Sequence, residues 1–186
     1  GETLSVAIGQ GYDLTTPLQM ALVAASVGNG GTRYRPLILD RVETMEGEVV
    51  HQNLPQVAGK IPASPRTLSI VQQGLWGAVN GERGTASRAR LKDIEVAGKT
   101  GTSQVVGRKE GGDDYLPPHL RPHAWFVAYA PAGSPRIAVA VLIENGEHGS
   151  SAAGPIAREM VKTYLRAPTG GPKAAAEDVR VLAGNG

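Results

Sequence analysis

The stretch at residues 97–105 reads Ala-Gly-Lys-Thr-Gly-Thr-Ser-Gln-Val and carries the strongest signal for both fold and chemistry. It lies within a longer run, residues 94–106, whose composition predicts a β-strand. A strand at the edge of a sheet presents unpaired N–H and C=O groups, and a central glycine leaves that edge open to an extended peptide. We therefore expect residues 99–102 to form a peptide-binding edge.

The side chains of this stretch suit a peptide that ends in a carboxylate. Lys99 supplies a fixed positive charge, and Thr100 and Thr102 supply hydroxyl donors. A backbone N–H here can also stabilise an oxyanion, an interaction worth roughly 3–4 kcal/mol in the transition state of acyl transfer. A phosphate-binding loop is disfavoured, because that motif needs a glycine where Asp93 stands and a helix where residues 101–106 are strand-like.

Two helices are expected ahead of this strand. The first begins at a capping box, Thr-Pro-Leu-Gln at residues 16–19, and ends at the glycine-rich residues 28–31. It is apolar on nearly every side over residues 18–27, so we expect it to be buried. The second opens at Ser-Pro, residues 64–65, and ends at Asn-Gly, residues 80–81. Its apolar stripe is formed by Leu68, Val71, Leu75 and Val79.

Further strands and a final helix complete the expected fold, which is α+β with an antiparallel sheet flanked by helices. The additional strands are residues 36–42 and 48–50, joined by a turn at residues 46–47, and residues 123–130 and 136–143, joined by a short Pro-rich turn. The last helix begins near residues 154–155 and is expected to pack on the sheet. The apolar face predicted to cover the sheet comprises Ile156, Met160, Val161, Tyr164 and Leu165.

The chain is expected to divide into one globular part and a tail. Residues 1–167 form the domain, and residues 168–186, which lack periodicity, are predicted to be disordered. The polar residues 82–93 are predicted to be a loop, and the Gly- and Pro-rich residues 107–122 a long loop bordering the site. Because the apolar pattern starts almost at once and without Met, we expect the chain to be a fragment.

Composition excludes several classes of function. The chain has 19 basic and 17 acidic residues, scattered along it, so nucleic acid is not an expected partner. Cysteine is absent, which removes disulfides, thiolate catalysis and Cys-based zinc sites. No apolar run approaches the roughly 18 residues that span a bilayer, so the chain itself is expected to be soluble.

Neither of two further polar clusters predicts a metal or cofactor site. His119 and His123 are four residues apart, but Pro122 between them prevents a shared helical face. Glu110, Asp113 and Asp114 lie beside glycines and basic residues, which is typical of a solvated loop. We expect no metal and no cofactor.

The chain resembles class B penicillin-binding proteins, particularly those of the penicillin-binding protein 2 type. Lys-Thr-Gly is the third signature of penicillin-recognising serine acyltransferases, after Ser-x-x-Lys and Ser-x-Asn. The resemblance runs from residue 1 to about residue 165. Its segments, in the family's order, are residues 5–11 (Ser-Val-Ala-Ile-Gly-Gln-Gly), 16–21 (Thr-Pro-Leu-Gln-Met-Ala), 84–86 (Gly-Thr-Ala), 97–105, 123–131 (His-Ala-Trp-Phe-Val-Ala-Tyr-Ala-Pro) and 143–146 (Ile-Glu-Asn-Gly).

The resemblance implies a D,D-transpeptidase that cross-links peptidoglycan, with a stem peptide ending in D-Ala-D-Ala as substrate and β-lactams as acylating inhibitors. It assigns Lys99, Thr100 and Gly101 to the catalytic wall of the site, and Thr102 and Ser103 to substrate binding. It also implies a place at the periplasmic face of the bacterial inner membrane and a membrane glycan polymerase of the shape, elongation, division and sporulation class as partner.

This sequence departs from the family pattern in one respect. It contains no Ser-x-x-Lys and no Ser-x-Asn, so the nucleophile and its activating lysine are absent and the chain alone is expected to be inactive. Two alternatives stay open at this point. One is a carboxypeptidase or β-lactamase of the same superfamily, and the other is a catalytically dead homologue that binds β-lactams or partners.

Overall fold

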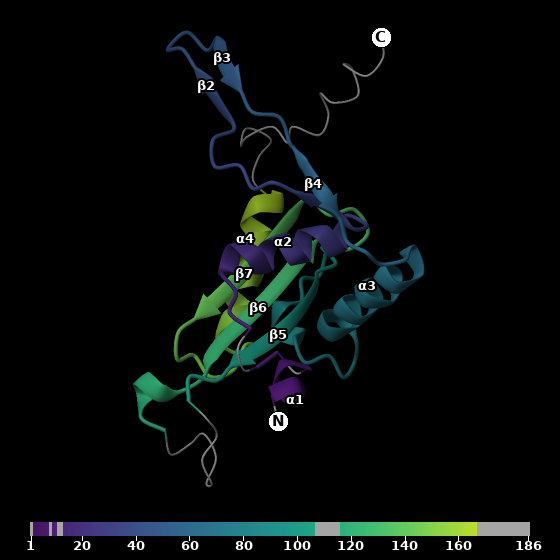
Figure 1. Ribbon diagram of the computed structural model, residues 1–186, viewed down its shortest axis with the longest axis vertical. Helices are drawn as coiled ribbons and strands as arrows, with labels where there is room; N and C mark the ends of the chain where they lie inside the picture. The colour runs from purple at the N-terminus through teal and green to yellow at the C-terminus, as the bar shows by residue number, and fades with distance from the viewer. Residues whose placement is uncertain (1, 8, 11–12, 107–115, 167–186) are drawn as a thin grey trace.

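The computed structural model describes residues 2–7, 9–10, 13–106 and 116–166. The predicted tail, residues 168–186, and the acidic cluster around Glu110 lie outside the described residues. The elements are α1 (Glu2–Ala7), α2 (Pro17–Gly28), β1 (Thr32–Tyr34), β2 (Arg41–Glu43), β3 (Val49–Gln52), β4 (Val57–Lys60), α3 (Pro65–Asn80), η1 (Ser87–Ala89), β5 (Ala97–Ser103), η3 (Pro118–Leu120), β6 (His123–Ala130), β7 (Ile137–Ile143) and α4 (Ala153–Arg166), shown in Figure 1.

The three predicted strands form an antiparallel sheet, in the order β5-β6-β7. Gly101 pairs with Trp125 across β5 and β6, and Phe126 pairs with Val141 across β6 and β7. Among the described residues β5 has a partner strand on one side, so it is an edge strand. The predicted strand at residues 94–106 was too long, because pairing with β6 is confined to residues 97–103.

Helices cover both faces of this sheet. Phe126 and Tyr129 are buried, at 0% and 1% exposure, and their odd spacing along β6 places them on opposite faces. A Cβ on Gly28 of α2 would meet the Tyr129 ring at 2.9 Å, and one on Gly154 of α4 would meet the Phe126 ring at 4.0 Å. The sheet is thus enclosed by α2 and α4, which lie on opposite sides of it in Figure 1.

The predicted contact face of α4 was largely wrong. The residues of α4 that are buried against the core are Ala153, Gly154, Ala157 and Val161. Three residues of the predicted stripe, Ile156, Met160 and Tyr164, are instead 42–46% exposed, whereas Leu165 packs partly against the core. Small side chains let the helix backbone approach the sheet closely, so the alanine face packs inward although its residues are less hydrophobic than the outer stripe.

The first predicted helix begins where expected but is not fully buried. Thr16 Oγ1 accepts the N–H of Gln19 at 3.2 Å, and Gln19 Oε1 accepts the N–H of Thr16 at 2.8 Å, which confirms the capping box. Within α2, however, Leu18 and Val23 are 56% and 52% exposed. Only one side of α2 packs on the sheet, because nothing in the described structure covers its other side.

A long arm extends away from the sheet between α2 and α3 (Figure 1). The predicted hairpin exists as β2 and β3, with its turn at Gly47 in the left-handed region at φ +89°. The first strand of that hairpin was predicted over residues 36–42, but it begins only at residue 41. The pairing of β1 with β4 at the base of the arm was not predicted.

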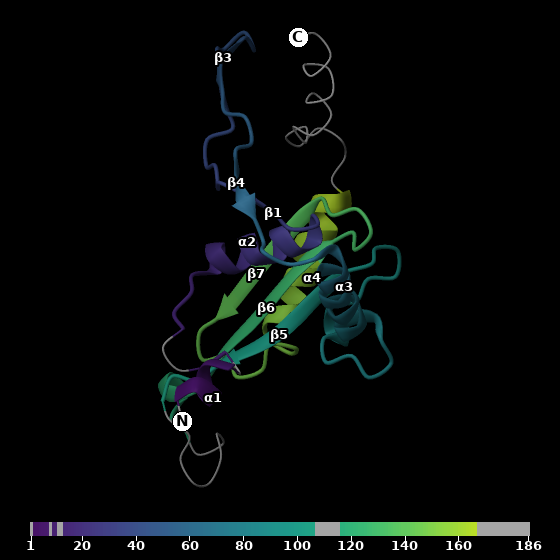
Figure 2. The ribbon, with the colours of Figure 1, turned by 45° about the vertical axis from the view of Figure 1, so that its right-hand side comes forward.

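Helix α3 lies beside β5 (Figure 2) and has the predicted boundaries. Ser64 Oγ accepts the N–H of Thr67 at 3.1 Å and so caps the helix. Gln72 Nε2 donates to the carbonyl of Val27 at 2.7 Å, which joins α3 to the end of α2. The region after α3 was predicted to be a polar loop, yet it contains η1 and buries Ala86 and Ala89 in the core.

An ion pair joins the C-terminal end of α4 to the segment before β5. Arg166 donates to both carboxylate oxygens of Asp93, at 2.6 and 2.7 Å. This hydrogen bond holds the pKa of the Asp93 carboxyl below its usual range. A carboxylate whose pKa is lowered by folding stabilises the fold above its unfolded-state pKa, and that contribution is lost as the pH falls through the folded-state pKa.

We therefore expect Asp93→Asn to lower the free energy of unfolding of the full-length gene product at neutral pH, by a modest amount because the pair is exposed. The difference in the free energy of unfolding between this variant and wild type should disappear in acid, at pH values below the usual pKa range of a carboxyl group. Denaturant unfolding at a series of pH values measures this. Glu82→Gln is the matched control, because Glu82 forms no ion pair among the described residues. A pH-independent deficit in Asp93→Asn contradicts the assignment.

Candidate active-site strand

The five residues expected to form the site lie together on β5. Lys99 and Thr102 are exposed, and Thr100, Gly101 and Ser103 are half-buried. The carbonyl of Thr102 and the N–H of Gln104 both hydrogen-bond to the side chain of Gln10, which lies outside the sheet. The even-numbered residues of β5 therefore direct their backbone N–H and C=O groups away from β6. Since these groups alternate along a strand, those of Gly98, Thr100 and Thr102 face the open edge.

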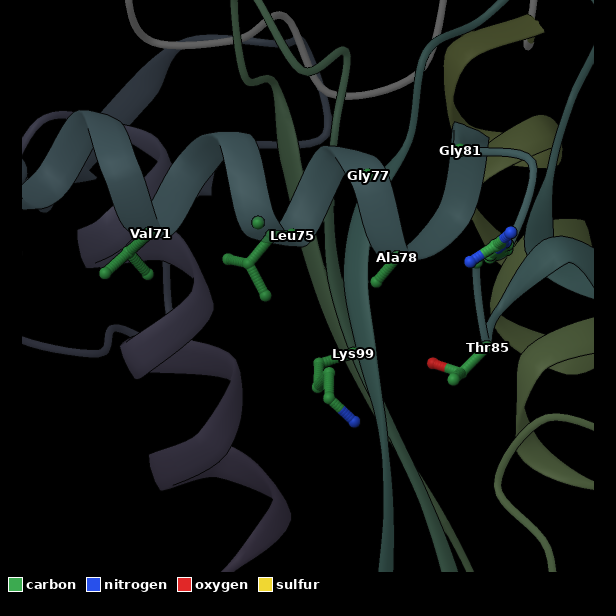
Figure 3. Close-up of a pocket in the computed structure, with 10 residues that line it drawn as sticks. Val71, Leu75, Gly77, Ala78, Gly81, Thr85 and Lys99 are labelled. Atoms are coloured by element: carbon green, nitrogen blue, oxygen red, sulfur yellow. The ribbon is translucent and has the colours of Figure 1, made fainter.

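Lys99 lies at the edge of β5 that faces α3. Its Nζ donates to the carbonyl of Thr100 at 2.8 Å and to the Thr100 hydroxyl at 3.4 Å. Figure 3 shows the Lys99 side chain beside β5 in the space below α3, with its amine pointing away from that helix. This space is a cavity of about 620 Å³, and its lining residues are Val71, Gly74, Leu75, Gly77, Ala78, Gly81, Arg83, Gly84, Thr85 and Lys99.

The cavity is mostly apolar, and its lining includes residues whose position there was not evident from sequence patterns alone. Val71 belongs to the predicted apolar stripe of α3, yet it is 43% exposed and lines the cavity. Gly84 and Thr85, which belong to the short Gly-Thr-Ala segment after α3, line the same cavity as Lys99. A charge bordered by apolar surface interacts more strongly with a ligand than one in open water.

The opposite end of β5 contacts the loop that follows β7. Thr102 Oγ1 donates to the carbonyl of Glu147 at 3.4 Å. The Glu147 carboxylate pairs with Arg121 at 2.9 Å, and the Glu147 N–H donates to the carbonyl of Pro122 at 2.9 Å. Glu147 has φ +61°, an unusual value for a residue other than glycine. These contacts hold the loop against the carboxyl end of the candidate strand.

The same loop makes a close backbone approach at Gly149. A Cβ on Gly149 would lie 2.8 Å from the carbonyl oxygen of Gly101 and would overlap the carbonyl oxygen of Trp125. Gly101 itself packs tightly, because a Cβ on it would lie 3.1 Å from the Cβ of Trp125. Because neither Gly149 nor Gly101 has a side chain, the loop and β6 can pack closely against Gly101, the last residue of the Lys-Thr-Gly triplet.

The two histidines do not share a helical face. His119 lies in η3, and His123 begins β6, where its Nδ1 accepts the N–H of Asn145 at 2.9 Å. In the part of the chain that the structure describes, no three metal-ligating side chains gather. None of the helices in that part is both long and apolar enough to traverse a bilayer.

A Lys-Thr-Gly strand at the open edge of an antiparallel sheet, with helices on both sheet faces, is typical of penicillin-recognising serine acyltransferases. The chain belongs to the penicillin-binding protein transpeptidase domain family, whose model matches residues 1–162. This match confirms the resemblance in sequence and the α+β fold.

Individual relatives agree with the family assignment. The chain is 37% identical over 177 residues to the peptidoglycan D,D-transpeptidase MrdA of Haemophilus influenzae, covering 89% of this chain and 26% of that protein. It matches the ceftriaxone acyl-enzyme complex of penicillin-binding protein A from Mycobacterium tuberculosis with a TM-score of 0.72 and 29% identity, over 87% of this chain and 35% of that one. The chain thus spans about a quarter to a third of the length of these proteins.

A third match is to a complex. The structure of penicillin-binding protein 2 with MreC from Helicobacter pylori aligns with a TM-score of 0.64 and 28% identity. The alignment covers 88% of this chain and 27% of that one. The arrangement of helices and strands described above therefore recurs in proteins of both the A and the 2 type.

The close packing at Gly149 leads to a prediction for the full-length gene product. Gly149→Ala should lower the free energy of unfolding by about 1–3 kcal/mol, because the added methyl group overlaps the backbone of β5 and β6. Gly133→Ala, in the β6–β7 turn, is the control, because its Cβ would have no neighbour within 4 Å. Equal stability of both variants in thermal unfolding would show that the strand does not depend on this contact.

Proposed function

We propose that the intact protein is a peptidoglycan D,D-transpeptidase that works through a serine acyl-enzyme. The observation that carries the proposal is the open edge of β5 with Lys99, Thr100 and Thr102 along it. Several relatives named D,D-transpeptidases support the reaction, and solved β-lactam acyl-enzymes of a relative support the covalent intermediate.

In this proposal the stem peptide docks on β5 as an added strand. The backbone groups of Gly98, Thr100 and Thr102 hydrogen-bond the peptide, and Gly101 leaves room for its close approach. Thr102 and Ser103 bind the terminal carboxylate, and the N–H of Thr102 stabilises the oxyanion that forms when the serine attacks the D-Ala carbonyl. The terminal D-Ala then leaves, and an amine of a neighbouring strand resolves the ester.

Lys99 and Thr100 form the electrostatic wall of the site in this scheme. The Lys99 amine contacts both the carbonyl and the hydroxyl of Thr100, so its charge lies directly at the edge where the peptide binds. A positive charge at this place favours a ligand with a carboxylate over a neutral one. It also stabilises negative charge that develops at the reacting carbonyl.

The nucleophile must come from another part of the protein, because these 186 residues contain no Ser-x-x-Lys. We propose that it approaches Lys99 from the cavity between α3 and β5. The exposed apolar residues of α2 and α4 support contact with further polypeptide, since such surfaces are usually covered. The relatives, which are about three to four times longer than the matched region, provide such polypeptide.

Two alternative functions differ in a measurable way. A carboxypeptidase or β-lactamase would pass the acyl group to water, so a penicillin adduct would be released faster than in a transpeptidase. A catalytically dead homologue would not form the adduct. The names of the relatives favour the transpeptidase over both.

The expected location and partners belong to the same proposal. We propose that the protein acts at the periplasmic face of the inner membrane, where peptidoglycan is assembled, together with a glycan polymerase of the shape, elongation, division and sporulation class. The relative from Helicobacter pylori was solved in a complex with MreC, which supports an assembly of several proteins. β-Lactams are proposed inhibitors at the same strand.

The function is tested by covalent labelling of the full-length gene product with a fluorescent penicillin. Wild type should form a stable adduct, and Lys99→Ala should be acylated about 100-fold more slowly, because an electrostatic contact to the developing oxyanion is lost. Lys92→Ala removes an exposed lysine outside the edge and is the matched control. Labelling of Lys99→Ala at the wild-type rate excludes the proposed role of Lys99, and an unlabelled wild type excludes the transpeptidase.

A further inference from the structure

Asn80, the last residue of α3, joins this helix to the segment that leads into β5. Its Nδ2 donates to the carbonyl of Val96 at 2.8 Å and to the carbonyl of Trp76, one turn back in α3, at 2.9 Å. Val96 is buried, at 1% exposure, and lies three residues before Lys99. The sequence explained Asn80 only as part of the Asn-Gly helix stop, so the contact with Val96 gives this residue a second role.

The other hydrogen bonds of α3 lead to different parts of the molecule. Gln72 bonds to the end of α2, and Arg90 and Ala86 bond the end of α3 to the segment that follows the helix. Within the described residues, the bond from Asn80 is the only hydrogen bond between α3 and residues 94–103. Apolar packing is non-directional, whereas a hydrogen bond fixes the distance and direction between two groups. The Asn80 side chain therefore sets the separation of α3 from the start of β5.

The two elements that Asn80 joins form walls of the cavity beside Lys99 (Figure 3). On the wall formed by α3, the lining residues are Val71, Gly74, Leu75, Gly77 and Ala78. A Cβ added to Gly74 or Gly77 would have no neighbour within 4 Å, so this wall leaves room for an incoming group. The width of the cavity is the distance from α3 to β5, and the Asn80 bond fixes that distance at one end.

We propose that Asn80 is a positioning residue that sets the width of the cavity in which the nucleophile meets Lys99. It does not line the cavity itself, so it acts through the place of α3. A group held between α3 and β5 reaches the reacting carbonyl only if the two walls are correctly spaced, because a displacement of about 1 Å can cost roughly 100-fold in rate. This inference rests on the proposed function, in which the nucleophile approaches Lys99 from this cavity.

The test follows acylation of the full-length gene product by a fluorescent penicillin over a range of penicillin concentrations. Such data separate the dissociation constant of the non-covalent complex from the acylation rate constant. Asn80→Gln keeps the amide but lengthens the side chain by one methylene group, so it can still bond the carbonyl of Val96 while α3 is displaced. Its acylation rate constant should be about tenfold lower and its dissociation constant within about twofold of wild type, because displaced walls alter the reacting geometry more than ground-state binding.

A second variant separates positioning from support of the fold. Asn80→Ala leaves the buried carbonyl of Val96 without its donor, so it should lower both the free energy of unfolding and the acylation rate constant. Asn80→Gln should instead unfold at nearly the denaturant concentration of wild type and still acylate slowly. Gln73→Asn is the matched control, because it shortens an exposed amide of α3 by one methylene group and should acylate as wild type does.

The outcomes distinguish this inference from the proposed function. If penicillin labels wild type and Asn80→Gln with the same acylation rate constant, Asn80 does not set the width of the cavity, and the proposed function stands. If the deficit of Asn80→Gln lies in the dissociation constant instead, the residue acts on ligand binding and the inference is also wrong. A wild-type protein that penicillin does not label overturns the proposed function, and this inference with it.

Discussion

The outer edge of β5 is the constraint on which the rest of the molecule depends. An edge strand must keep its backbone groups unpaired to bind a peptide, yet unpaired edges also invite unwanted pairing with other chains. Here α3 lies beside the edge, and the amides of Asn80 and Gln10 occupy its two ends. The open part is thereby limited to the residues that carry the Lys-Thr-Gly triplet.

The edge strand must also have a fixed position, and close packing around β5 provides it. A Cβ on Gly98 would lie 2.7 Å from the carbonyl oxygen of Val127 and 2.9 Å from the Phe126 ring. Phe126 in turn lies against α4, and Tyr129 on the other face lies against α2. The glycines of β5, Gly98 and Gly101, therefore allow the strand to pack closely against β6.

Local signals in the sequence predicted most of the fold, and long-range contacts account for the errors. Caps at Thr16 and Ser64 depend on residues within one helical turn, so their helices were located correctly. The face of α4 was wrong because burial there is decided by how closely Ala157 approaches the sheet, which hydrophobicity does not encode. The pairing of β1 with β4 and the contact of Gln10 join distant segments, and no local pattern specifies them.

The geometry at Thr100 links the charge of the site to its backbone edge. Its carbonyl faces the open side of β5 and accepts a hydrogen bond from Lys99 at 2.8 Å. A carbonyl oxygen has two lone pairs, so it can accept an N–H from a docked peptide without losing the lysine. Lys99 and the N–H of the docked peptide would then both donate to the Thr100 carbonyl oxygen, and charge-assisted hydrogen bonds polarise the groups they join. In the proposed docking of a peptide on β5, the positive charge of Lys99 would thus be coupled to peptide binding through the Thr100 carbonyl, and a neutral residue at position 99 would weaken that binding.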